Sequence, residues 1–227
     1  MHGGLSVTNI QIEPAIFYFG TPVVLIGSSN DDGSFNLAPM SSAWWVGWRC
    51  MLGLARNSKT TENLIRSGEC VLNLPSDGLV AAVDRLARTT GSEPVPPGKI
   101  MRGYRHAKDK FGISGLTARP GDTVAAPRAM ECPVQIEAKL AQVHAMAQED
   151  EVWRGHLVAI EVRVTRVHAH PAILMDGEPN RIDPGKWRPL IMSFQQFYGL
   201  KPDQLQRSEL AQIPEAMYRP PGWRPAG

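Results

Sequence analysis

The stretch that concentrates the most chemistry in the fewest residues is Arg56–Thr61, which reads RNSKTT. It places two cations and three hydroxyl groups directly before a segment with helical apolar periodicity. A helix N-terminus presents unpaired N–H groups and a partial positive charge, so anions bind there readily. Arginine adds a planar fork that can grip two phosphate oxygens, and lysine adds a point charge. A cap needs only one hydroxyl, from Ser58 or Thr60, so the surplus donors indicate a phosphate site; a well-capped surface helix is the simpler alternative.

A second polar stretch lies upstream at Asn36–Ser42, which reads NLAPMSS. It follows the turn signal NDDG and precedes a pair of tryptophans. An asparagine, a proline and two serines are unusual inside a strand, and proline is tolerated there mainly at edges and bulges. Such a strand end leaves backbone groups free for a flat polar ligand, with Asn36 and Ser41 adding side-chain bonds. An irregular edge strand without a ligand is the alternative.

The elements around these two stretches are expected to be mostly strands. Strand character is predicted where residues are β-branched or alternate in hydrophobicity, at 22–29, 34–41, 49–55, 70–74, 130–146 and 156–167. The first two of these form a hairpin. Helices are predicted at 60–67, ended by Gly68, at 78–88 and, shorter, at 108–113. The remaining segments are interpreted as a loop at 89–105, mixed structure at 189–197 and an arm after Leu200.

Size and composition limit the class of protein. The 227 residues fit one large domain or two small ones, and a hydrophobic content of 43% allows a substantial core. A formal net charge of +2 argues against a nucleic-acid-binding surface. Cys50, Cys70 and Cys132 form no close pair, so buried free thiols and a reducing, cytoplasmic compartment are expected. The chain shows no signal peptide and no apolar run of bilayer length, so no membrane association is expected.

The fold class follows from the number of strands. Several strands with two or three helices predict a mainly β protein with appended helices, built on a β-rich barrel. No internal repeat or composition shift marks a domain boundary. A doubly wound nucleotide-binding fold is disfavoured, because the chain lacks GxGxxG, GxxxxGK(S/T) and a regular alternation of strands and helices.

Taken together, the two polar stretches resemble a known family. The order PVVLIGSSNDDGSFNLAPMSS and then LARNSKTTENLIRSGECVLNLPS is similar to the flavin reductase-like family of FMN-binding split barrels. That family carries an N-x-A-P-x-S type motif after the turn and an R-x-S-K-T-x-x-N type motif before the helix. The segments DKFGISGLTARPGD, ECPVQIEAKL and RPLIMSFQQFYGL extend the resemblance over residues 10–205.

The resemblance implies an FMN-binding split β-barrel of six strands that works as a homodimer. Residues 1–205 would form this domain, and 206–227 a proline-rich C-terminal tail. The FMN phosphate would lie at Arg56–Thr60, and the ring and ribityl chain along Asn36–Ser42, near the subunit interface. The implied cofactor-binding residues are Asn36, Ala38, Pro39, Met40, Ser41, Ser42, Arg56, Ser58, Lys59 and Thr60.

The implied activity is that of an FMN-dependent oxidoreductase. NAD(P)H:flavin reductase is the leading interpretation, with the reductase component of a two-component monooxygenase as one form of it. A flavin carries hydride chemistry itself, so no catalytic side chain is assigned and no triad is expected. NADH or NADPH is the expected donor, although the chain lacks the Gly-Asp-His segment of some members. An FMN protein that acts on an organic substrate or with oxygen, and a non-catalytic flavin or phosphate-ligand protein, stay open as alternatives.

Two further groups of residues could carry chemistry. His168 and His170 share one face of a strand, but no cysteine or carboxylate constellation accompanies them in the sequence, so no metal site is expected. Trp44, Trp45 and Trp48 fit a buried core or a dimer interface. A wall over the flavin or its substrate is the alternative for the tryptophans.

Overall fold

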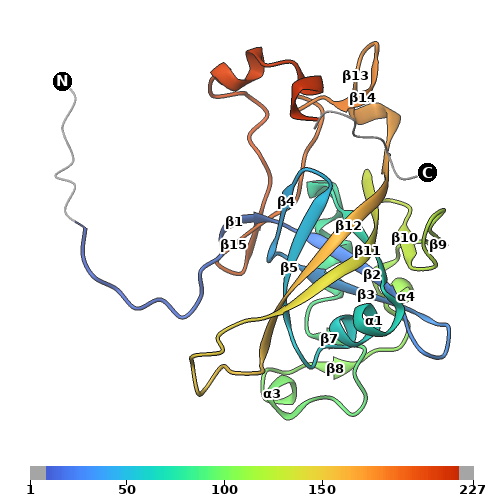
Figure 1. The fold of residues 1–227 in the computed structure, drawn as a ribbon, viewed down its shortest axis with the longest axis vertical. Coiled ribbons are helices and arrows are strands. Elements are labelled where there is room, and N and C mark those ends of the chain that lie inside the picture. Colours follow the sequence, from blue (N-terminus) through green and yellow to red (C-terminus); the bar gives the residue numbers. More distant parts are fainter. Residues whose placement is uncertain (1–8, 220–227) are drawn as a thin grey trace.

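The computed structural model describes residues 9–219, and its centre is a seven-stranded antiparallel sheet that curls into a barrel (Figure 1). The strands, in sheet order, are β3 (Phe35–Met40), β2 (Val24–Ser29), β6 (Glu69–Leu74), β11 (Val134–Ala145), β12 (Leu157–Ala169), β5 (Arg49–Ala55) and β4 (Ala43–Val46). The two end strands, β3 and β4, are joined by Ser41 and Ser42 alone. The sheet therefore has to curve until its two edges meet at this junction, which we call the seam.

Local sequence signals explain the β2–β3 hairpin and helix α1. β2 and β3 form the predicted hairpin, and Gly33 adopts a φ of 79° in its turn. Helix α1 (Lys59–Ser67) begins where Ser58 accepts a hydrogen bond from the Thr61 amide at 3.1 Å. It ends at Gly68, whose φ of 71° is the left-handed conformation that glycine adopts without strain. The predicted hairpin and the predicted helix that ends at Gly68 are both confirmed.

Two apolar clusters hold the barrel together. The first fills the interior with inward-facing residues of six strands, among them Val24, Ile26, Leu52, Leu72, Ile136, Ile160 and Val162. The second lies on the outer face of β2 and β3 and packs α2 (Val80–Arg85) and α4 (Lys110–Ser114) against them; it includes Leu25, Leu37, Val83, Leu86, Phe111 and Leu190. Burial of this kind is the main favourable term in folding.

The segment at residues 89–105, interpreted from sequence as a loop, is partly structured. It contains β7 (Thr89–Thr90), α3 (Pro97–Ile100) and the start of β8 (Arg105–His106). β7 pairs in parallel with β8, so each strand depends on a partner remote in sequence, which composition cannot reveal. The helix predicted at 78–88 is also shorter: a 3-10 turn at Asp77–Leu79 leads into α2.

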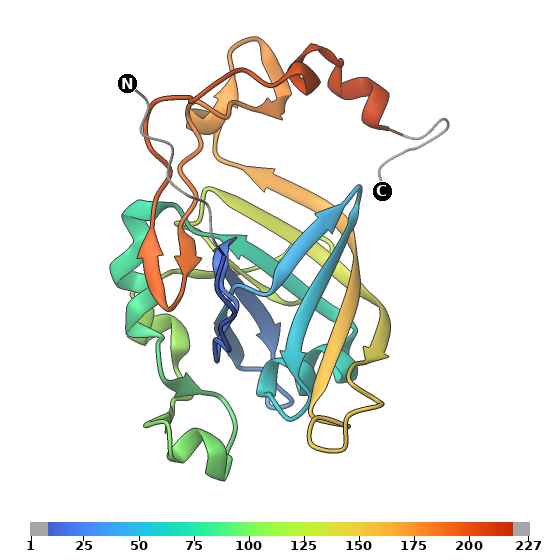
Figure 2. The same ribbon diagram turned by 90° about the vertical axis from the view of Figure 1, so that its left-hand side faces the viewer.

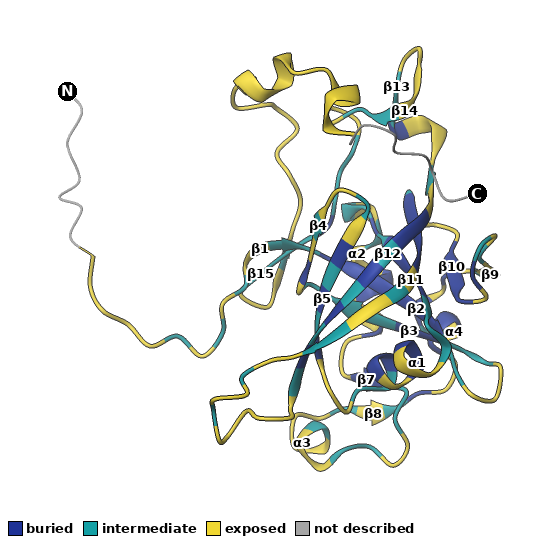
Figure 3. Cartoon of the chain, viewed as in Figure 1, coloured by how far each residue is buried: buried dark blue, intermediate teal, exposed yellow. Residues whose placement is uncertain are grey.

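Smaller elements surround the barrel (Figure 2). They are the sheet of β1 (Phe19–Pro22), β15 (Ile191–Ser193) and β16 (Gln196–Tyr198), and the hairpins β9 (Ala118–Pro120) with β10 (Pro127–Ala129) and β13 (Leu174–Met175) with β14 (Glu178–Ile182). The expected arm after Leu200 is exposed from 200 to 219 and holds 3-10 turns at Glu209–Gln212 and Glu215–Tyr218 (Figure 3). The rest of the predicted tail, residues 220–227, lies outside the described residues. No helix between residues 9 and 219 is long and apolar enough to cross a bilayer.

Candidate functional site

The two polar stretches of the sequence meet at the barrel. Asn36, buried on β3, donates from Nδ2 to Thr60 Oγ1 at 3.3 Å, and Thr60 is itself buried at the start of α1. At the seam, the Gly53 amide of β5 donates to the Ser42 carbonyl at 2.8 Å. A Cβ on Gly53 would lie 3.1 Å from the Ser42 Cβ, so a larger residue would push the two segments apart by a few tenths of an ångström. The structure thus brings both predicted motifs into one region.

The N-terminus of α1 has unused donors. Ser58 is the cap, and its hydroxyl also lies 2.9 Å from Thr61 Oγ1, so it is already engaged. Within the described part of the chain, the amides of Lys59 and Thr60 donate to no other group, and Arg56 is exposed with no partner for its guanidinium. Two amides and a guanidinium are therefore free to bind an anion, as the residue types predict.

Lys59 departs from the expectation of a free cation. Its Nζ lies 2.7 Å from Glu62 Oε1 and 3.6 Å from Asp31 Oδ1. The hydrogen bond to Glu62, with the charges of both carboxylates, raises the pKa of Lys59 despite its partial burial. The ammonium ties α1 to the β2–β3 hairpin, so an anion at the helix start has to share it with two carboxylates.

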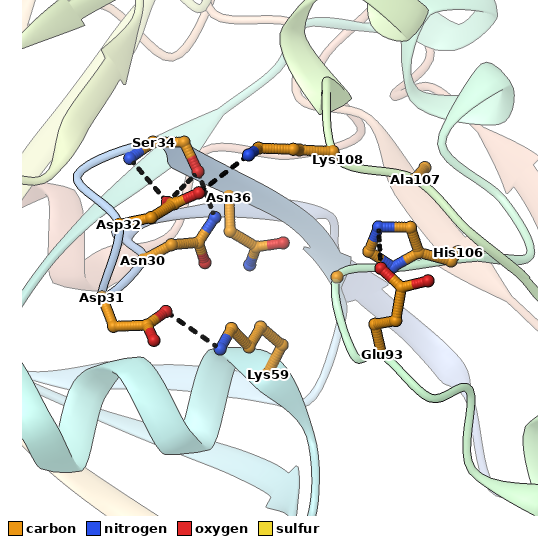
Figure 4. Close-up of a pocket in the computed structure, with 11 residues that line it drawn as sticks. Asn30, Asp31, Asp32, Ser34, Asn36, Lys59, Glu93, His106, Ala107 and Lys108 are labelled. Carbon is orange, nitrogen blue, oxygen red and sulfur yellow. Dashed lines mark hydrogen bonds and ion pairs between the residues drawn. The ribbon is translucent and has the colours of Figure 1, made fainter.

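A polar pocket of about 170 Å³ opens beside Asn36 and Lys59 (Figure 4). Its walls are the β2–β3 turn, the start of α1 and the residues near β7 and β8: Asn30, Asp31, Asp32, Ser34, Asn36, Lys59, Gly91, Glu93, His106, Ala107 and Lys108. An ion pair of 2.9 Å between Lys108 and Asp32 joins two of these walls, and one of 3.2 Å between His106 and Glu93 lies within the wall near β7 and β8. The pocket contains two of the ten predicted site residues; Ala38 to Ser42 lie outside it.

Gly91 shows how closely the supposed loop packs on this pocket. A Cβ on Gly91 would lie 2.8 Å from Asn36 Oδ1 and 3.1 Å from Lys59 Cγ. Gly91, Glu93 and residues 106–108 therefore form one wall of the candidate site, which was not predicted from the sequence. The signal that could have found it is a glycine directly after the two threonines of β7, because close backbone approach is a common reason for glycine in such a position.

β3 offers a free backbone edge to a ligand. In an antiparallel pair, alternate residues direct both backbone groups to the partner strand. Pro39 has no N–H and must belong to the set directed away from β2, together with Leu37. β3 is an end strand of the sheet, and Ala38, Pro39 and Met40 are half-buried. The Leu37 carbonyl accepts a hydrogen bond from Lys110 Nζ, and the rest of this edge, up to the seam, can bond a flat polar ring through its backbone.

The three tryptophans divide between the core and the surface. Trp45 and Trp48 pack against the barrel cluster, as expected of core residues. The Trp45 Nε1 atom is buried without a partner among the described residues. Trp44 is 57% exposed on β4.

His168 lies in a polar cluster that the sequence did not reveal. The reason given for expecting no metal, the absence of carboxylates, is wrong: Asp122 and Glu137 come within 4.8 Å of the imidazole. However, Glu137 accepts hydrogen bonds from His168 Nε2 at 2.7 Å and from the amides of Asp122 and Thr123 at 2.8 and 2.6 Å. Arg128 and Arg166 both bond Asp122. The donors around these carboxylates favour a structural network over a cation site.

We predict that this network makes the free energy of unfolding depend on pH in the acid range. Burial alone would raise the pKa of Glu137, but hydrogen bonds from Thr123, Asp122 and His168 outweigh it and lower that pKa to about 2. A group with a lowered folded-state pKa stabilises the fold above its unfolded pKa and loses this contribution as the pH falls. Between about pH 5 and pH 2 the free energy of unfolding should fall by about 3 kcal/mol from this group.

Urea unfolding of the wild type and of Glu137→Gln at both pH values measures this contribution. The variant should be less stable at pH 5 and should lose less on acidification. An identical pH dependence of the two proteins would show that Glu137 is not responsible.

Comparisons with known proteins agree with the fold. A family model described as flavin reductase like domain matches residues 16–198. The uncharacterized protein YdfE of Bacillus subtilis (strain 168) is 36% identical over 190 residues, which cover 84% of this chain and 88% of YdfE.

Two solved structures are similar at low identity. Flavoredoxin of Desulfovibrio vulgaris (Miyazaki F) has a TM-score of 0.71 at 20% identity and covers 91% of this chain and 100% of its own. Nitrilotriacetate monooxygenase component B from Bacillus cereus has a TM-score of 0.69 at 19% identity and covers 89% of this chain and 100% of its own. These likenesses confirm the expected mainly β, split-barrel fold.

Proposed function

Because the chain belongs to the flavin reductase-like family, we propose that it is an FMN-dependent oxidoreductase whose activity is NAD(P)H:flavin reduction. The observation that carries the proposal is the Asn36–Thr60 hydrogen bond, which places the free edge of β3 beside the donor-rich start of α1. A phosphate and a flat heteroaromatic ring, joined by a short chain, match these two neighbouring surfaces.

The residues of this chain bind and orient the cofactor. Arg56 and the amides of Lys59 and Thr60 would hold the phosphate, and the Lys59 ammonium would be shared between it and two carboxylates. The β3 edge that follows Leu37 would hold the ring, and Ser41 and Ser42 would close its far end. When bound, FMN supplies the hydride chemistry, so the protein needs an open ring face rather than a general base.

Nicotinamide-dependent bleaching of bound flavin tests the proposal. We expect the purified protein to bind FMN, one per subunit, and the yellow colour to disappear on anaerobic addition of NADH or NADPH. Bound flavin that stays yellow would refute the reductase and favour action on an organic substrate or a non-catalytic role. A protein that binds no FMN would refute every flavin-based function.

The product of flavin reduction is reduced flavin, which a second protein could use. The name of the similar Bacillus cereus structure describes it as component B of a monooxygenase. This supports the proposal that the chain delivers reduced flavin to an oxygenase partner. Oxygen-dependent hydroxylation by a separately purified oxygenase, fed by this protein and NADH, would be the direct measurement.

We also propose a homodimer, and predict that the surface formed by Phe19, Trp44, Val46 and Phe194 mediates it. All four are exposed, and β1 lies beside β4 in both views (Figures 1 and 2). The Phe19 and Phe194 rings contact edge to face, with centroids 4.8 Å apart. Exposed apolar surface of this kind is typical of protein interfaces.

Sedimentation at micromolar concentration should show a dimer for the wild type and a monomer for Trp44→Glu, because burying an unpaired carboxylate is unfavourable. Val152→Glu, at an exposed apolar residue in the turn between β11 and β12, is the matched control and should stay dimeric. A wild-type monomer that still binds FMN tightly would refute the proposed dimer.

A further inference from the structure

Lys110 is a buried lysine without an acidic partner. It is the first residue of α4, only 1% of its surface is exposed, and its Nζ donates to the Leu37 carbonyl at 3.4 Å. No ion pair among residues 9–219 includes it, and the charge that acts on it is another cation, Lys99. Burial, with repulsion from Lys99, lowers the pKa of Lys110 to about 8, so the side chain is still mainly an ammonium at neutral pH.

An uncompensated buried charge is costly, and the surroundings of Lys110 do not require one. Its neighbour Phe111 belongs to the apolar cluster outside the barrel, where an aliphatic side chain would pack at lower cost. Lys99 lies on the same side of the molecule, with its Nζ 3.0 Å from Thr90 Oγ1, next to Gly91 at the wall of the pocket.

Lys110 contacts the edge of β3 through its hydrogen bond to the Leu37 carbonyl. Leu37 directs its backbone groups away from β2, so the carbonyl that Lys110 binds belongs to the free edge. The next residues, Ala38 and Pro39, lie on the stretch proposed to bind the flavin ring, and consecutive Cα atoms are about 3.8 Å apart. The ammonium is therefore fixed at the free edge of β3, at the residue that precedes the stretch proposed to bind the ring.

We infer that Lys110 is a positioning residue that holds a positive charge beside the flavin ring and stabilises its reduced form. The inference rests on the proposed function. Hydride transfer adds two electrons and one proton to the neutral ring, while the nicotinamide donor loses the same two electrons and proton, so the flavin gains one negative charge. A fixed cation binds the negative form more tightly than the neutral one.

The test measures the affinities of oxidised and reduced FMN separately. In Lys110→Met we expect oxidised FMN to bind within about twofold of wild type and reduced FMN to bind about tenfold more weakly. A tenfold difference corresponds to a fall of about 30 mV in the two-electron midpoint potential of bound FMN. Anaerobic binding titrations and a dye-coupled redox titration measure these quantities independently of enzyme turnover.

Lys139→Met provides the matched control. Lys139 lies on β11 with a half-exposed side chain 3.8 Å from Glu69, so the variant has the same change in net charge at a position remote from β3. Its midpoint potential should equal that of the wild type. Lys110→Arg keeps the charge and should retain the potential, and Lys110→Gln keeps a donor for Leu37 without the charge and should behave as Lys110→Met does.

The outcomes distinguish this inference from the proposed function. If Lys110 is merely structural, Lys110→Gln weakens both forms of FMN equally or lowers only thermal stability, and the inference is refuted. An unchanged potential in every folded Lys110 variant also refutes it. A wild-type protein that binds no FMN refutes the proposed function, on which the inference depends.

Discussion

Arg56→Ala should weaken FMN binding by about 10- to 150-fold while leaving riboflavin binding almost unchanged. The guanidinium is exposed beside the start of α1 and is free of partners within the described residues, so it can form charge-assisted bonds to a phosphate. Loss of such a bond costs about 1.5–3 kcal/mol, which gives the stated range. Riboflavin lacks the phosphate and cannot lose this contact.

Fluorescence titrations of the two ligands against the wild type, Arg56→Ala and Arg119→Ala measure the effect. Arg119 is an exposed arginine in the β9–β10 hairpin and serves as the control for loss of one positive charge. Lys59→Ala should have a smaller effect than Arg56→Ala, because Glu62 and Asp31 already share its ammonium. Equal losses for FMN and riboflavin in Arg56→Ala would place the phosphate elsewhere.

Ala38→Trp should reduce flavin affinity by at least about 100-fold while the barrel stays folded. Ala38 is half-buried at the free edge of β3, where the ring is proposed to lie, so an indole there occupies the space of the ring. A 100-fold loss corresponds to about 2.8 kcal/mol of binding free energy, which is the expected scale when the contacts of the ring are blocked. The phosphate segment at α1 is left intact, so inorganic phosphate should compete with whatever FMN binding remains.

Flavin titration together with circular dichroism checks this prediction. Ala81→Trp, at an exposed alanine of α2, is the control and should bind FMN normally. Ala38 pairs with Ile26 of the barrel core, so Ala38→Leu provides a smaller obstruction if the indole disturbs folding. Normal FMN affinity and a normal rate of reduction in folded Ala38→Trp would rule out this location for the ring.

Much of the fold near the site could be predicted because its signals are local. The NDDG turn specifies the β2–β3 hairpin, and Ser58 and Gly68 delimit α1, since a turn, a cap and a left-handed glycine each act within a few residues. The two motifs that identify the family are also short runs of sequence. Free cysteines were expected from their spacing, and all three are buried and unpaired.

β4 illustrates a feature that local signals could not determine. The resemblance implied six strands, but the main sheet has seven, because β4 pairs with β5 after the chain turns at Ser41 and Ser42. Whether a short tryptophan-rich stretch becomes a strand depends on the partner edge that is available. β7 and β8 likewise depend on an available partner. Each has two residues, and they pair only when the segment between them brings its two ends together.

The sequence by itself determined which residues can bind an anion and a flat ring, and the local elements that carry them. Only the tertiary structure decided that Asn36 bonds Thr60, that Gly91 forms a wall against them, and that Lys110 is buried behind Leu37. It likewise assembled Asp122, Glu137 and His168 from three separate segments. The physical reason is that a cap or turn is stabilised by neighbours in sequence, whereas these contacts arise when a curved sheet brings distant residues together.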